Sequence, residues 1–394
     1  MKFLILFQIS LLLLACQDAS ITRYRDAANP PVSNDQVTDE TNSETSVTSN
    51  KIFRFTGTGA EMGLQQGKAF NQEISELLEK WLMPALEVDG GLGQIFARAV
   101  TSSMSKNVSS DFLEEVAAVA KSSGVNESDV MIANSAADID QLKTDPRNIF
   151  GCSTLIISPK RSATGGMMIG RNLDYPDSNI LRSKWKAVVF AKQGKLKIFS
   201  IHVPGLSGVL TGINEKGVFL AIKVSSGNST KYGTPAGFIF RSILESATTA
   251  KQALDLYVKQ KRTVALNVTI ADGVDAYELE IDSKNFGTRN FSDKGTLYGA
   301  NHFELKSMGG TPDNRDDRWA KLAKFDESST PVTFADLKAT IAATGDPIGN
   351  VLAVFVDYKA KEITFGSDPQ GESIAASGEL RTYKFDEIFK SPAQ

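Results

Sequence analysis

The sequence predicts an α+β fold, with helices gathered before residue 151 and short strands after it. Residues 51–86 open with a short strand and then place apolar residues at three- and four-residue spacing, which is typical of amphipathic helices. Helical patterns continue through residues 110–124 and 128–142. From Cys152 onward, short β-rich runs alternate with turn sequences such as "ATGG", "KQGK" and "NEKG". The pattern therefore changes at the Gly151–Cys152 bond.

The strands expected after that bond follow one another in hairpin-like pairs. The first runs are "STLIIS", "GMMIGRNLDY", "KAVVFAK", "KLKIFSIHV", "VLTGIN" and "VFLAIKV". Further along we expect a helix at roughly 237–260, strands at 265–273 and 276–282, a helix near 333–344 and a hairpin over 351–366. Consecutive hairpins indicate antiparallel sheets, and the helices between groups of strands predict two sheets covered by helical layers.

The charge of the chain argues against a polyanionic partner. The formal net charge is -3, and residues 51–394 hold 40 basic and 40 acidic residues. An electroneutral body does not capture nucleic acid by long-range attraction, so no nucleic-acid partner is expected. The basic stretch "RSKWKAVVFAKQGKLK" alternates cations with apolar residues, which is typical of a half-buried strand with one solvated face.

The N-terminus has the features of an export signal. Residues 1–15 combine Lys2 with an apolar run too short to span a bilayer. "LLAC" at residues 13–16 is similar to a bacterial lipobox, in which Cys16 becomes the lipidated first residue; the alternative is an ordinary signal peptide with a chance cysteine. Residues 16–50, rich in Ser, Thr, Asn and Asp, are expected to form a disordered tether. We therefore expect a protein of the bacterial cell envelope, held at the membrane by lipid on Cys16. Gln17, by resemblance to lipoprotein sorting rules, favours the outer membrane.

Cysteine and histidine counts narrow the chemistry. Once Cys16 is acylated, Cys152 is the only thiol left, so it cannot form a disulfide within the chain. A lone thiol outside the cytoplasm is either a buried structural residue or a functional one. The two histidines, His202 and His302, form no Cys/His cluster, which argues against a structural zinc site.

Two bases could activate Cys152 as a nucleophile. His202 or His302 could reach it after folding, as in a Cys–His dyad, although "CSTLIIS" is expected to be a strand and not the start of a helix. Alternatively, the base is the α-amine of Cys152 itself, which has a pKa near 7.7–8.0 when free. That amine exists only if the Gly151–Cys152 bond is cut. Glycine suits this step, because it tolerates the strained backbone that lets the thiol attack the preceding carbonyl.

Several motifs occur in the order found in one known family. "GCST" is followed by "RNLD", "GINEKG" and "ANHF…DDR", and the chain opens with "FTGTGAEMGLQQGKAF". This series resembles the N-terminal-nucleophile (Ntn) hydrolases, and most closely the acyl-CoA:6-aminopenicillanate acyltransferase-like family, related to choloylglycine hydrolase and acid ceramidase. The resemblance covers about residues 52–385. It implies a four-layer αββα sandwich of antiparallel sheets, cut into an N-terminal segment of residues 51–151 and a second chain of residues 152–394.

The resemblance also implies a role for each matching residue. Cys152 would be both the autoproteolytic and the catalytic nucleophile, and Gly151 the residue before the cut. The pair in "RNLD" would act on it: Asp174 would hold the new α-amine, while Arg171 would lower the thiol pKa or position the substrate. Asn214 would supply a backbone N–H to the oxyanion hole and Asn301 a side-chain donor. Arg318 would close the site, with Arg315 as the alternative. Simpler, non-catalytic interpretations exist for two of the motifs: "RNLD" could form a structural ion pair, and "NEKG" could be only a hairpin turn.

The expected activity is cleavage of a linear non-peptide amide bond, or transfer of its acyl group, through a thioester on Cys152. No metal or organic cofactor is needed. Alternatives are a choloylglycine-type or phospholipase-B-like hydrolase of conjugated or lipid substrates, and a non-catalytic envelope lipoprotein that keeps the fold. The sequence leaves open the substrate, the choice between hydrolysis and transfer, and the oligomeric state.

Overall fold

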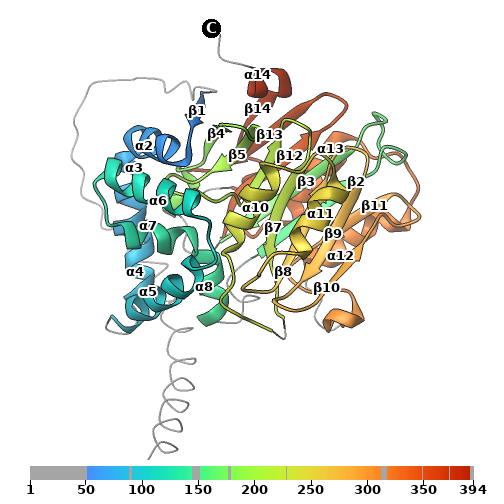
Figure 1. Ribbon diagram of the computed structural model, residues 1–394. Helices are drawn as coiled ribbons and strands as arrows, with labels where there is room; N and C mark the ends of the chain where they lie inside the picture. The colour runs from blue at the N-terminus through green and yellow to red at the C-terminus, as the bar shows by residue number, and fades with distance from the viewer. Residues whose placement is uncertain are drawn as a thin grey trace, which may run out of the picture.

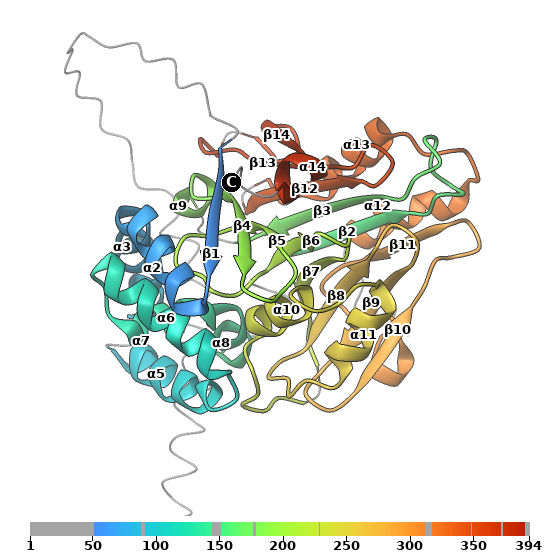
Figure 2. The ribbon, with the colours of Figure 1, turned by 45° about the horizontal axis from the view of Figure 1, so that its top comes forward.

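The computed structural model describes residues 51–87, 91–143, 151–175, 179–227, 229–311, 317–347, 349–371 and 373–390. The predicted signal peptide, Cys16, the tether and Arg315 lie outside these residues. Within them, two sheets lie face to face, and helices cover their outer faces (Figures 1 and 2). The α+β prediction, with two antiparallel-rich sheets between helical layers, is confirmed.

The larger sheet has eight strands in the order β1-β4-β5-β6-β7-β8-β9-β10. Their bounds are β1 Ile52–Gly57, β4 Lys186–Lys192, β5 Ile198–His202, β6 Thr211–Asn214, β7 Phe219–Val224, β8 Leu266–Ala271, β9 Ala276–Ile281 and β10 Phe286–Arg289. Only β1, at the edge, pairs in parallel with its neighbour; the other pairs are antiparallel. The strand that opens the N-terminal segment thus belongs to a sheet built mainly from the second half of the chain.

The smaller sheet has six antiparallel strands in the order β11-β2-β3-β12-β13-β14. Their bounds are β2 Gly151–Ile157, β3 Met168–Asp174, β11 Thr296–Gly299, β12 Asn350–Asp357, β13 Glu362–Ser367 and β14 Glu379–Lys384. β2 and β3 are central and buried on both faces. Cys152 therefore lies near the start of a buried interior strand, flanked by β11 and β3.

Seven α-helices in the described part of the N-terminal segment pack over the β1 and β4 end of the larger sheet. They are α2 Gly59–Ala69, α3 Asn71–Leu77, α4 Met83–Leu86, α5 Leu92–Ser105, α6 Ser110–Ser123, α7 Glu127–Asn134 and α8 Ala136–Lys143, with the π-helical turn η1 Leu78–Leu82 between α3 and α4. The glycines of "FTGTGAEMGLQQGKAF" explain the closest contact. A Cβ on Gly63 would lie 2.4 Å from the backbone carbonyl oxygen of Glu115 in α6. Glycine at this position therefore lets the backbones of α2 and α6 come close together.

The remaining helices complete the layers. Their bounds are α9 Asn179–Arg182, α10 Ala236–Leu244, α11 Ala250–Val258, η3 Lys306–Met308, α12 Asp317–Ala323, η5 Lys324–Glu327, α13 Phe334–Thr344 and α14 Phe385–Phe389. Helices α10 and α11 cover the larger sheet, whereas α12 and α13 cover the smaller one. None of the helices among the described residues has the length and apolar character needed to cross a membrane.

The single helix expected at roughly 237–260 is instead two helices. α10 ends at Leu244, and α11 begins after Thr249, whose hydroxyl accepts a hydrogen bond from the Gln252 N–H at 3.1 Å. Thr249 is in an extended conformation, so it acts as an N-cap and interrupts the helical backbone. The apolar spacing continues across the break, which is why periodicity alone did not reveal it.

Candidate active site

Cys152 is the second residue of β2 and is 3% exposed. In the β2–β3 register it lies opposite Leu173, and Thr154 lies opposite Arg171. Residues i and i+2 of a strand share a face, and so do directly opposed residues, so the Cys152 and Arg171 side chains project on the same side of the sheet. Ile156 and Leu173 belong to the core between the two sheets, so this side faces the larger sheet.

Arg171 is fully buried, with much of its hydrogen-bonding capacity unused. Its Nη2 donates to the Ile222 carbonyl at 2.9 Å, whereas Nε and Nη1 have no hydrogen-bond partner in the part of the chain that the structure describes. A buried guanidinium with open donors beside a thiol can stabilise a thiolate or bind a carbonyl or carboxylate oxygen. The site therefore holds a cation ready to accept a ligand.

The Gly151–Cys152 bond lies next to an ion pair formed by Asp174 and Arg318. Gly151 is directly opposite Asp174, which ends β3. Arg318, on α12, places Nη1 3.7 Å from Asp174 Oδ2 and donates to the Cys152 carbonyl at 3.3 Å. The structure thus brings Arg318 to the predicted site, whereas Arg315 lies outside the described residues.

Burial is the main influence on the pKa values of the Asp174 carboxyl and the Cys152 thiol. It raises the pKa of Asp174 to about 7, and this effect outweighs a 2.5 Å hydrogen bond from Asn350 and the charge of Arg318, which both lower it. Burial also raises the pKa of the Cys152 thiol, while the Arg171, Arg318 and Lys223 cations oppose that rise. The thiol of the intact chain is therefore held as a neutral group that the surrounding cations can help to ionise.

Asn301, just after β11, contacts the nucleophile directly. Its Oδ1 accepts a hydrogen bond from the Cys152 N–H at 2.5 Å, and its Nδ2 donates to the Val224 carbonyl at 2.7 Å. The predicted oxyanion donor therefore lies at the bond that would be cut. Asn267, which sequence reasoning missed, holds this segment: its Nδ2 donates at 2.7 Å to the carbonyls of Ala300 and His302, on either side of Asn301.

Asn214 does not join this cluster, so its predicted oxyanion role is not supported by the geometry. Its backbone N–H donates to the Val218 carbonyl at 3.0 Å, inside the β6–β7 hairpin. Its Nδ2 donates to the carbonyls of Leu244 and Ala247, which ties the hairpin to the end of α10. The simpler interpretation of "NEKG" as a turn describes what the structure shows.

Neither histidine is hydrogen-bonded to Cys152. His202 donates to Gln66 Oε1 at 3.0 Å, and burial lowers its pKa to about 3, so the ring stays neutral. His302 shares a 2.9 Å hydrogen bond with Glu304 and packs edge-on against Trp319. The described residues include no group of three or more His, Cys, Asp or Glu side chains that could hold a metal ion.

A second buried ion pair lies between the sheets near the nucleophile. Lys223 Nζ is 3.0 Å from Glu278 Oε2 and donates to Thr269 at 2.6 Å, and both side chains are fully buried. Thr154, two residues after Cys152, donates to Glu278 at 2.9 Å. This pair was also missed by sequence reasoning. The two charged residues and the two threonines that contact them come from four strands, β2, β7, β8 and β9, and form no sequence motif.

Cys152 and Arg171 line a cavity of about 90 Å³. Most other lining side chains are apolar or aromatic, among them Trp81, Leu173, Trp185, Leu206 and Leu210. Helices of the N-terminal segment form one wall, and strands of both sheets, connecting loops and helices α9 and α10 form the rest. Such a lining favours a largely apolar ligand.

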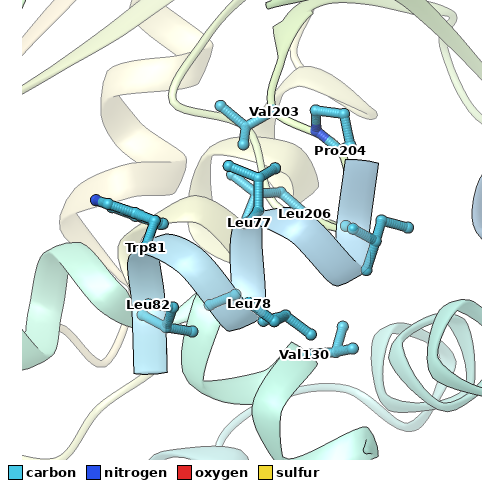
Figure 3. Close-up of a pocket in the computed structure, with 11 residues that line it drawn as sticks. Leu77, Leu78, Trp81, Leu82, Val130, Val203, Pro204 and Leu206 are labelled. Carbon is cyan, nitrogen blue, oxygen red and sulfur yellow. The ribbon is translucent and has the colours of Figure 1, made fainter. Parts of the chain in front are cut away.

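A smaller apolar cavity of about 20 Å³ lies alongside and shares Trp81, Ala133, Val203 and Leu206 with the first. Figure 3 shows its side chains converging from the helix that carries Leu77 and Trp81, from Val130 on α7 and from the 203–206 loop. Trp81 therefore stands between two apolar spaces, only one of which contains the nucleophile.

The fold and the Cys152 constellation together define the class of protein. The family model for acyl-coenzyme A:6-aminopenicillanic acid acyl-transferase matches residues 162–366, which include Arg171, Asp174, Asn301 and Arg318. The chain belongs to this family of Ntn hydrolases, as the motifs had indicated.

Among curated proteins, the chain is similar to the N-acylethanolamine-hydrolyzing acid amidase of Caenorhabditis elegans, with 26% identity over 202 residues. The match covers 49% of this chain and 56% of the length of that protein. The solved structure of the same C. elegans ortholog gives a TM-score of 0.43 at 16% identity, covering 52% of this chain and 92% of that one. The structure of penicillin V acylase from Agrobacterium tumefaciens gives a TM-score of 0.36 at 15% identity, covering 55% of this chain and 83% of that one. A variant of the conjugated bile acid hydrolase from Clostridium perfringens gives a TM-score of 0.36 at 10% identity, covering 59% of this chain and 96% of that one.

Proposed function

We propose that the chain is a self-processing Ntn amidase that hydrolyses N-acyl amides with an apolar acyl group. The observation that carries this proposal is the shared lining of one cavity: Cys152 and the open donors of Arg171 lie among largely apolar side chains. The similar C. elegans protein is an N-acylethanolamine-hydrolyzing acid amidase, which agrees with this choice of bond.

The proposed first step is cleavage of the Gly151–Cys152 bond. The Cys152 thiol loses its proton and attacks the Gly151 carbonyl carbon, the C–N bond breaks with a proton delivered to nitrogen, and a thioester links Gly151 to sulfur. Water then hydrolyses the thioester, which leaves the Gly151 carboxylate, the free thiol and a new α-amine on Cys152. Asp174 and Arg318 both lie beside Gly151, within ion-pair distance of each other, and would handle the charges that develop at this bond.

In turnover, the α-amine of Cys152 takes the proton of its own thiol and returns it to the departing amine. The acyl group remains on sulfur as a thioester, with its oxygen facing the Asn301 amide, until water releases the acid. We further propose that lipid on Cys16 holds the enzyme in the bacterial cell envelope, where N-acyl amides of membrane origin would reach it.

The test is incubation of purified residues 51–394 with N-acyl p-nitroanilides, beside Cys152→Ala. Expected are two fragments, the larger starting at Cys152, and release of nitroaniline by wild type alone. A single uncut and inactive chain would contradict the proposal. Adding hydroxylamine separates hydrolysis from acyl transfer, since a transferase would form the hydroxamate in preference to the free acid. For the envelope proposal, full-length protein should move to the membrane fraction, and Cys16→Ser should not.

A further inference from the structure

The cavity wall formed by α7 and α8 carries two polar side chains, Asn134 at the end of α7 and Asp138 in α8. Asn134 has its hydrogen bonds satisfied by the protein. Its Oδ1 accepts from the N–H groups of Ser207 at 2.7 Å and Gly208 at 3.0 Å, and its Nδ2 donates to two further carbonyls. Asn134 therefore shapes the wall but offers little to a ligand.

Asp138 is different, because only one of its oxygens is used. Oδ2 accepts from the Ala236 N–H at the start of α10 at 3.1 Å. Oδ1 is buried and has no hydrogen-bond partner in the described part of the chain, although the residue is only 2% exposed. An unpartnered buried carboxyl oxygen is costly, so such groups usually meet a ligand, an ion or water.

The hydroxyl of Tyr257, on α11, is the protein group that could compete for this oxygen. Burial and the Asp138 charge raise the pKa of the phenol, yet no hydrogen bond joins the two groups. Asp138 lines the cavity and Tyr257 does not. Asp138 therefore contributes to the cavity lining a carboxyl group with one oxygen that the described part of the chain leaves unpaired.

We propose that Asp138 is a specificity residue that binds a hydrogen-bond donor, a hydroxyl or an ammonium group, on the part of the substrate that fills the cavity. This inference rests on the proposed amidase function, because Cys152 lines the same cavity. A purely apolar acyl group would cover the open oxygen and leave it unpaired, whereas a substrate donor would satisfy it.

The chemistry of the carboxyl fits either donor. Burial raises its pKa to about 7, and the Ala236 N–H only partly opposes this, so both protonation states occur near neutral pH. An ammonium ligand would favour the ionised form as an ion pair, and a hydroxyl would donate to it. Arg171, which also lines this cavity, is a cation, so the two charged side chains would bind different ends of one substrate.

The test compares three straight-chain N-acyl p-nitroanilides of equal length, bearing a methyl, a hydroxyl or an amino group within the acyl chain. The variant is Asp138→Asn, whose side-chain oxygen can still accept from the Ala236 N–H. Wild type should hydrolyse a donor-bearing probe at least about tenfold better in kcat/KM than the methyl probe. In Asp138→Asn the advantage of the amino probe over the methyl probe should fall below about twofold. An advantage confined to the amino probe identifies an ammonium ligand, whereas an advantage of the hydroxyl probe identifies a hydroxyl.

Tyr257→Phe is the matched control and should leave the preference intact. Equal kcat/KM values for all three probes, in both wild type and Asp138→Asn, would overturn the proposal while leaving the amidase function standing. If Asp138→Asn only lowers the melting temperature and keeps the preference among probes, the proposal is overturned in the same way. If no probe is hydrolysed, calorimetric binding of the three probes to Cys152→Ala and Cys152→Ala/Asp138→Asn decides. If the donor-bearing probes bind more tightly than the methyl probe only when Asp138 is present, the role of Asp138 is supported even though the amidase function is not. Equal affinities of the three probes overturn the role of Asp138.

Discussion

Gly151 and Asp174 are so close across the β2–β3 pair that no side chain fits on Gly151. A Cβ at residue 151 would lie 2.6 Å from Asp174 Oδ2 and 2.9 Å from Arg318 Nη1. Both distances are shorter than a normal non-bonded contact of a carbon atom. Glycine is thus required here for its small size, which lets a carboxylate and a guanidinium approach the peptide bond that we propose is cut.

We therefore expect Gly151→Ala to stop or strongly slow self-cleavage, because the new methyl group pushes Asp174 and Arg318 away from the bond. The measurement is the fraction of cut chain on a denaturing gel over time. Gly349→Ala is the control: Gly349 lies at the same end of β3, and its Cβ would meet the nearest atom at an ordinary 3.5 Å. Normal cutting of Gly151→Ala would show that the contact has no role in processing.

A second prediction concerns the carboxyl of Asp174. Since burial raises its pKa to about 7, it is neutral below that pH and ionised above it. If the ionised form holds the α-amine of Cys152, kcat/KM should rise with pH up to about 7. Asp174→Asn can keep the hydrogen bond from Asn350 but cannot ionise, so it should lose this limb and about 10²- to 10⁴-fold of the rate. The pH profile of the cut enzyme measures both effects. A rate that falls as pH rises through 7 would instead assign the protonated acid to catalysis.

A third prediction tests the segment around Asn301. Asn267→Ala removes the amide that joins the carbonyls of Ala300 and His302, so Asn301 between them, the proposed oxyanion donor, should lose its position. We expect kcat to fall about tenfold or more with KM nearly unchanged, because the oxyanion forms only in the transition state. In an Asn301→Ala background the same substitution should cost little further activity.

Asn214→Ala is the matched control for Asn267→Ala. Asn214 also donates to two carbonyls, at 2.9 and 2.7 Å, but away from the nucleophile. Both variants should lose stability, and only Asn267→Ala should lose kcat. Equal losses of kcat in the two variants would mean that the effect is general destabilisation, or that Asn214 acts in the site after all.

The sequence predicted those parts of the site that are local in the chain or carried by a family motif. Cys152 and Arg171 lie on one face because β2 and β3, consecutive along the chain, pair as antiparallel neighbours in a register that puts Thr154 opposite Arg171. Asn301 and Arg318 were found through the order of motifs. Asp138 could not be predicted in this way, because it lines a cavity whose other walls come from distant parts of the chain. Only the tertiary contacts show which of its carboxyl oxygens lacks a hydrogen-bond partner.

The position of Asn214, away from the Cys152 cluster, has a related cause. "NEKG" predicts a tight turn from local chemistry alone, and the structure contains that turn. Its place in the motif series suggested a catalytic neighbour, but strand order puts β7 between β6 and β8, with the turn at the far end from Val224. Motif order along the chain does not specify which end of a strand faces a site.

The last prediction concerns stability and uses Glu115, a fully buried acid on α6 away from the nucleophile. Burial raises its pKa from 4.5 to about 7, since desolvation outweighs the attraction of Arg241, 3.6 Å away. Between these two pH values the folded chain keeps a proton that the unfolded chain has released. The free energy of unfolding should therefore fall as pH rises through this window, by on the order of 3 kcal/mol in total. Glu115→Gln cannot titrate, so its stability relative to the parent should rise over the same range.

Urea unfolding at pH 5 and pH 8 measures this difference, in a Cys152→Ala background so that every chain stays uncut. Comparing variant with parent at each pH cancels the titration of other buried groups, including His202, whose lowered pKa acts in the opposite direction. Glu114→Gln, at the exposed neighbouring position, should show no pH-dependent difference from the parent. A Glu115→Gln difference that is the same at both pH values would mean that Arg241 keeps this acid ionised in the folded chain, and that the ion pair dominates over burial.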